Sequence, residues 1–166
     1  MTLVKWAPIV LAVLAMLGLT AVIAGQAGLL RGMAPTDLGV HSGMLKAPST
    51  TPNSVSSQAA LHPAHPMRDQ ADIAPLPLRG DGPSTLARIQ ANVTTMAGAI
   101  VVTRETDYLH AQFETRWMKF VDDTEFWFDA KANVVQVRSA SRIGHKDFDV
   151  NRQRVEAIRA RLASAP

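Results

Sequence analysis

Arginine residues gather near the end of the chain, and acidic residues precede them. Residues 138–161 contain seven Lys/Arg and three Asp/Glu, whereas residues 104–131 contain four Lys/Arg and seven Asp/Glu. A guanidinium binds a carboxylate or a phosphate through two parallel hydrogen bonds. The two segments therefore pair in an internal network, or they leave a guanidinium of Arg138, Arg142 or Arg152 for an anionic ligand. We favour the network for Arg138 and Arg152, and a ligand role for Arg142.

Asp122 and Asp123 are adjacent carboxylates that allow two interpretations. Paired carboxylates can have separated pKa values and act as general acid and base, which would suit a hydrolase or a transferase working with Arg138 and Arg142. Alternatively, they begin a strand and pair with one of these arginines. The second interpretation is favoured, so the sequence identifies no catalytic residue and leaves open whether the protein is an enzyme.

Two serines and an asparagine accompany the charged residues. Ser139 and Ser141 fall on a predicted strand and are expected to bond to backbone or arginine, because no Gly-x-Ser-x-Gly motif is present. The candidate ligand-binding residues are Asp122, Asp123, Arg138, Ser139, Ser141, Arg142, Asn151 and Arg152.

Metal binding has weak support. His62 and His65 lie three residues apart on a proline-rich segment, which gives them no fixed common face. Asp147, Asp149 and Asn151 match the start of a calcium loop, but arginine and isoleucine occupy the positions that need glycine and glutamate. Helix capping by Asp149 or Asn151 explains these residues. The sequence therefore predicts no metal site and no cofactor, and cysteine is absent.

In the segments that position these residues, the spacing of the apolar side chains changes along the chain. Leu86, Ile89 and Val93 follow Ser84 at helical spacing, and Val155, Ile158 and Leu162 repeat this pattern near the end. Between these helices, short segments rich in β-branched and aromatic residues predict four strands: 100–104, 108–116, 124–129 and 134–141.

Alternation within the second strand predicts one buried face. Leu109, Ala111 and Phe113 share a face, so Tyr108 and His110 are expected on the opposite, exposed one. Short connections favour an antiparallel arrangement with the helices on one face. The predicted fold class is therefore α+β: a four-stranded antiparallel meander with a helix before it and a helix after it.

The first thirty residues predict a transmembrane helix. No charged residue occurs between Lys5 and Arg31, and roughly 20 apolar residues suffice to cross a bilayer. A cleavable signal peptide is the alternative, because small residues precede Gly25 and Ala27, but the apolar run exceeds a signal core. The charges on the two sides nearly balance. The position of the segment favours a single-pass membrane protein with its domain on the non-cytoplasmic, periplasmic side.

Four regions are expected in the chain. Residues 1–6 form a short flank and 7–30 the anchor, which contacts membrane lipid. Residues 31–52 contain much Gly, Pro, Ser and Thr without a period, which is typical of a flexible tether. Residues 53–166 form the globular domain, and its proline-rich beginning is expected to lie extended against the rest.

Several motifs carry a resemblance to a known family. They are Val55-Ser56-Ser57-Gln58, Phe120-Val121-Asp122-Asp123 with Glu125-Phe126, and Arg138-Ser139-Ala140-Ser141-Arg142 with Gly144, Asp147, Asn151-Arg152 and Arg154. Over residues 53–162 the chain resembles the domain-of-unknown-function family 1499. The resemblance implies a bacterial protein, often with an N-terminal hydrophobic segment, and no particular reaction. The family's pattern usually has glycine shortly before the Asn-Arg pair, where this chain has Asp149.

The functional expectation is a membrane-anchored envelope domain that acts as a binding or interaction module. Its partner is an anionic small molecule or another envelope protein. The alternative is a hydrolase or transferase that uses Asp122 and Asp123. Nucleic acid is not expected as a partner, because the net charge is only +3 and no aromatic platform is interleaved with the basic residues.

Overall fold

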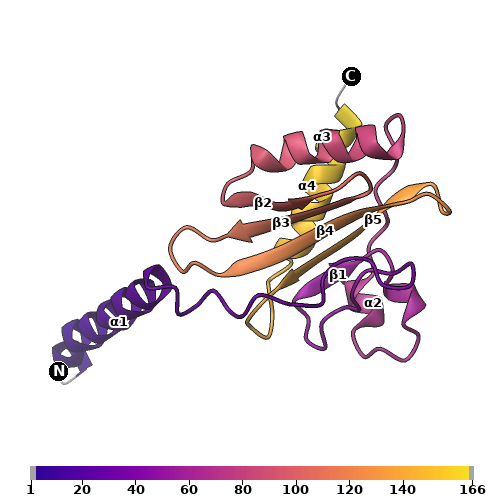
Figure 1. Cartoon of the computed structure of the whole chain (residues 1–166). Coiled ribbons are helices and arrows are strands. Elements are labelled where there is room, and N and C mark those ends of the chain that lie inside the picture. The colour runs from indigo at the N-terminus through magenta and orange to yellow at the C-terminus, as the bar shows by residue number, and fades with distance from the viewer. Residues whose placement is uncertain (1–2, 165–166) are drawn as a thin grey trace.

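The computed structural model describes residues 3–164, with side chains from Trp6 onward. The first helix, α1 (Leu3–Gln26), projects from one end of an α+β domain (Figure 1). Residues Trp6–Gln26 have a mean hydropathy of 2.5, and within this range the rest of the protein buries only Gly25, next to the end of the helix. By length and composition this helix can cross a membrane, a property that a signal sequence near the N-terminus shares.

The domain is built on a five-stranded antiparallel sheet in the order β1-β5-β4-β3-β2. Its strands are β1 (Ser54–Ser56), β2 (Ala99–Arg104), β3 (Tyr108–Glu114), β4 (Val121–Asp129) and β5 (Val134–Ser141). The α+β class and the antiparallel meander are confirmed. The strand count was one too low, because β1 is a three-residue strand within the proline-rich region and pairs with the edge of β5.

Two long helices, α3 (Gly82–Thr94) and α4 (Val150–Ser164), cover one face of the sheet, called here the helix face. Shorter turns, η1 (Ala59–Leu61) and α2 (Arg68–Ala71), lie beside β1. The main core lies between these helices and the sheet. It contains Ile89, Leu109, Phe126, Val137 and Ile158, each at most 1% exposed.

The helix ends differ in detail from the expectation. The Asp81 carboxylate accepts a hydrogen bond from the Ser84 amide at 2.7 Å, so Asp81, not Ser84, caps α3. At α4, the Asp147 carboxylate accepts the Asn151 amide at 3.0 Å, so Asp147 takes the role expected of Asp149 or Asn151. Both helices therefore begin with a carboxylate against the positive end of the helix dipole.

The opposite face of the sheet is covered by the segment 33–49, called here the strap, and this face is called the strap face. Tyr108 and His110 were expected to be exposed, but they are only 8% and 7% exposed. The strap places Gly39 against Glu125 and Ala47 against Arg138, so the polar face of β3, β4 and β5 is enclosed. The predicted exposure of this face was therefore wrong.

Candidate functional site

Strand β5 supplies side chains to two separate clusters. Successive residues of a strand point to opposite faces of the sheet. Ser139 and Ser141 therefore lie on the helix face, while Arg138 and Arg142 lie on the strap face. Strand β4 divides its aspartates in the same way: Asp122 faces the helices and Asp123 faces the strap. The two aspartates do not form a carboxylate pair, which removes the geometry that shared acid–base chemistry needs.

Asn151 is the centre of the helix-face cluster and is completely buried. Its Oδ1 accepts hydrogen bonds from Ser139 Oγ and from Arg154 Nη1, both at 2.6 Å. The two hydrogens of its Nδ2 are shared among three oxygen atoms: Asn53 O at 3.1 Å, Ser141 Oγ at 3.1 Å and Asp147 Oδ2 at 2.9 Å. All the hydrogen-bonding groups of this amide are used, so it joins β5, α4 and the chain before β1.

Arg154 completes the helix-face cluster. Its Nη2 donates to Asp122 Oδ2 at 2.6 Å, and its Nη1 also reaches Ser139 Oγ at 3.1 Å. Its guanidinium lies 4.4 Å from the centre of the Phe113 ring, a cation–π distance. Arg152, the neighbouring candidate, lies outside the cluster and donates to the Gln70 carbonyl at 2.7 Å. The sequence analysis named Arg152 as a candidate, whereas the structure brings Arg154 to this cluster.

On the strap face, Asp123 holds Arg142 through two hydrogen bonds. Arg142 Nε donates to Asp123 Oδ2 at 2.7 Å, and Nη2 donates to Oδ1 at 2.9 Å. The ring Nε2 of His110 lies 2.9 Å from the same Oδ1. Burial raises the pKa of Asp123, but the hydrogen bonds from Arg142 and His110 outweigh burial and lower the pKa to about 2. Asp123 is therefore ionised at neutral pH.

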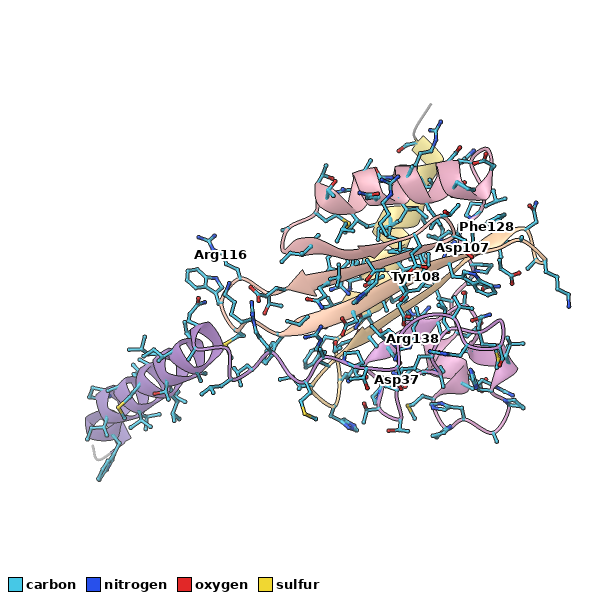
Figure 2. All side chains as sticks on the ribbon, in the orientation of Figure 1. Asp37, Asp107, Tyr108, Arg116, Phe128 and Arg138 are labelled. Atoms are coloured by element: carbon cyan, nitrogen blue, oxygen red, sulfur yellow. The ribbon has the colours of Figure 1, made fainter. Side chains whose placement is uncertain are left out.

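Glu125 is the second buried carboxylate of this face, at 0% exposed. Its Oε1 accepts hydrogen bonds from the Tyr108 hydroxyl at 2.8 Å and from the Gly39 amide of the strap at 2.7 Å. Burial and the charge of Glu125 raise the pKa of Tyr108, so the hydroxyl stays protonated and donates. Figure 2 shows Tyr108, Arg138 and Asp37 on this side of the sheet.

Arg138 is 4% exposed and has weaker partners than Arg142. Its Nε donates to the Ala47 carbonyl at 3.2 Å, and its Nη1 lies 3.5 Å from Glu125 Oε2. Among the described residues, no acceptor lies within hydrogen-bond distance of its Nη2. Burial lowers the pKa of Arg138, although a guanidinium remains charged in proteins. This buried cation therefore has an unused donor.

The unused donor borders a pocket of about 860 Å³ between the strap and the sheet. Lys46, Arg138 and Arg142 contribute positive charge to its lining. Lys46 Nζ contacts Asp37 Oδ1 at 2.6 Å, and this hydrogen bond lowers the pKa of Asp37. Asn53 also lines the pocket, and its buried Oδ1 accepts no hydrogen bond from the described residues. The pocket lining combines apolar side chains with polar and charged ones, and its volume is within the size range of small-molecule sites.

Comparison with known proteins gives one match. Residues 44–162, more than half of the chain, match the family described as "Protein of unknown function (DUF1499)". The chain belongs to this family. No curated protein and no solved structure matches significantly.

The structure gives physical roles to the residues that carried the DUF1499 resemblance. Gln58 is 4% exposed; its Oε1 accepts the Leu45 amide at 2.8 Å, and its Nε2 donates to the Gly43 carbonyl at 3.2 Å. It therefore holds the strap, together with Glu125 and Arg138. Asp149 has φ of 65°, in the left-handed region that favours glycine.

Proposed function

We propose that this DUF1499 protein is a single-pass membrane protein whose domain binds a small molecule carrying a carboxylate or phosphate group. The ligand lies in the pocket between the strap and β5. The observation that carries the proposal is the buried Arg138 beside this pocket, whose Nη2 has no acceptor among residues 3–164. Because no group among the described residues accepts from this nitrogen, it can donate to a bound anion in place of water, and a charge-assisted hydrogen bond of this kind is strong.

The contrast with Arg142 and Arg154 supports the choice of Arg138. Each of these two arginines makes a hydrogen bond of 2.7 Å or less to an aspartate, whereas Arg138 lies 3.5 Å from its carboxylate. A strong internal pair competes with a ligand, and a weak one does not. We therefore assign the ligand contact to Arg138 and a supporting role to Arg142, which reverses the preference drawn from the sequence.

The anchor part of the proposal rests on α1, with its N-terminus inside and the domain on the periplasmic side. Alkaline phosphatase fused after Pro166 should then be active. Green fluorescent protein fused at the same position should be dark, because it does not become fluorescent after general secretion. The opposite pattern would place the domain in the cytoplasm.

Binding is tested with the full chain in detergent micelles, titrated with inorganic phosphate and with citrate. Either probe, if it binds, raises the melting temperature along a saturable curve. Salts also stabilise proteins generally, but that effect grows steadily with concentration. In the Arg138→Gln variant, the melting temperature should lose its saturable rise with anion concentration and keep only the steady, linear rise.

Arg161→Gln is the matched control. Arg161 is an exposed arginine at the other end of α4 and donates to Asn92 O and Thr95 Oγ1. This variant carries the same charge change but leaves the pocket intact, so it should titrate like the wild type. Equal saturable curves for wild type and Arg138→Gln, or none in the wild type with either probe, would contradict anion binding at Arg138.

A further inference from the structure

The end of α1 contacts the domain at one particular loop. The Gln26 side-chain Nε2 donates to the carbonyl oxygens of Arg116 and Trp117, at 3.2 and 2.9 Å. Gly25 lies so close to the loop that an added Cβ would stand 2.6 Å from the Met118 carbonyl oxygen. Gln26 is the last residue of the apolar span. The loop 115–120 therefore lies at the level where α1 leaves the bilayer, if α1 crosses it.

A second loop, 143–149, lies near the same exit point. A Cβ on Gly32 would stand 2.7 Å from Ile143 Cγ2, so this loop packs against the chain only six residues after Gln26. Loop 115–120 precedes β4 and loop 143–149 follows β5, and these two strand ends border each other in the sheet, since Asp122 pairs with Ser141. Figure 2 shows Arg116 at the end of the domain nearest to α1. We call loops 115–120 and 143–149 the rim loops.

Each rim loop exposes a large aromatic side chain beside a cation. Trp117 is 60% exposed, and the Arg116 guanidinium lies 4.8 Å from the centre of its ring. Phe148 is 77% exposed, and Lys146 Nζ lies 6.0 Å from its ring centre. Exposed aromatic rings cost free energy in water, but tryptophan with nearby Lys or Arg is typical of the bilayer interface.

We propose that the two rim loops rest on the bilayer that α1 crosses. The Trp117 and Phe148 rings enter the interfacial layer, while Arg116 and Lys146 contact lipid headgroups. This inference depends on the membrane insertion of α1 proposed above, but not on the ligand. The partner is a lipid surface, and contact with it fixes the domain close to the membrane instead of letting it hang from a loose linker.

The test uses full chains with one tryptophan each, reconstituted in phosphatidylcholine vesicles with or without bromine on the upper acyl chains. In the Trp6→Phe/Trp127→Phe chain, bromine should lower Trp117 emission about twofold, since interfacial rings lie at the headgroup–acyl boundary. A Trp6→Phe/Trp117→Phe chain keeps only Trp127 as the matched control. It lies about 20 Å further along β4, at roughly 3.4 Å per residue, and should keep its emission.

Two further chains separate the possible outcomes. A chain with Trp6 alone reports the insertion of α1 itself. Quenched Trp6 with unquenched Trp117 would overturn rim contact and leave the anchor standing, whereas unquenched Trp6 would overturn both. In a chain without other tryptophans, Phe148→Trp should be quenched like Trp117, because both rim loops touch the bilayer. If the Phe148→Trp chain is not quenched, contact between the second loop and the bilayer is overturned. Urea melts confirm that each chain is folded.

Discussion

The two faces of β5 differ in how completely their polar groups are bonded. On the helix face, Asn151 makes five hydrogen bonds, and Arg154 joins it to Asp122. On the strap face, Arg138 has weak partners and borders a pocket. One strand with one alternating motif therefore supports a closed network on one side and an open site on the other. Neighbouring polar residues of one motif need not share a role.

The largest effect is expected from opening the closed network. Asn151→Ala removes the buried amide that Ser139, Ser141 and Arg154 share as a partner, so the free energy of unfolding should fall by about 3 kcal/mol. Urea denaturation of the full chain in micelles measures this. The neighbouring Arg152→Ala removes one exposed contact and should cost less than about 1 kcal/mol. Comparable losses for both variants would refute the central role of Asn151.

The next effect separates the two strap-face arginines. Arg142→Lys breaks the two-bond pair with Asp123 and should lower the free energy of unfolding by about 2 kcal/mol. Arg138→Lys breaks longer contacts and should lower it by less than about 1 kcal/mol, while it weakens the saturable response to anions. If Arg138→Lys is more destabilising than Arg142→Lys, Arg138 is the arginine that supports the fold. The ligand contact would then have to be assigned to Arg142 instead.

The pKa of Asp123 gives a pH signature of the strap face. Its folded value of about 2 lies below the ordinary 3.8, so ionised Asp123 stabilises the fold above pH 3.8. That contribution, about 2 kcal/mol, is lost as the pH falls from 3.8 toward 2. The stability difference between wild type and Asp123→Asn should therefore shrink over this range. A difference that stays constant would show that Asp123 is not held ionised by Arg142.

The smallest effect concerns the loop before α4. Asp149 has φ of 65°, so Asp149→Gly relieves strain and should change the free energy of unfolding by at most about 0.5 kcal/mol, in the stabilising direction. Asp149→Ala keeps a Cβ at this positive φ and lacks the short polar side chain that tolerates the left-handed region, so it should cost about 1 kcal/mol. Thermal melts of the two variants rank them, and an alanine variant at least as stable as the glycine variant would contradict this loop geometry.

Periodicity predicted the strands well but could not predict what covers them. The limits of β5, 134–141, and the opposite directions of Arg138 and Val137 follow from alternation alone. The burial of His110 does not, because the strap has no period and contributes scattered residues such as Leu45, which is 2% exposed. Alternation predicts that a polar strand face is exposed to solvent, and the pattern is the same whether water or an irregular segment covers that face.

The partners of α4 show a second limit. Arg154 lies three residues after Asn151, so one helical turn brings both side chains to the same side. Helical spacing could therefore have identified Arg154, whereas Arg152 is rotated away toward α2. Glu125, Tyr108 and Gln58 were not selected because their roles depend on the strap.

The route of the chain from α1 to the sheet has a mechanical consequence. The strap is the first part of the domain after the helix, and Gly32 already packs against Arg142 and Ile143. Tension applied along α1, by bilayer bending or by drag on the domain, is carried by the contacts of Gln26 and Gly32 and then by the strap with its bonds to the sheet. The wall of the pocket is thus also the linkage through which a pull on the membrane anchor would reach the sheet.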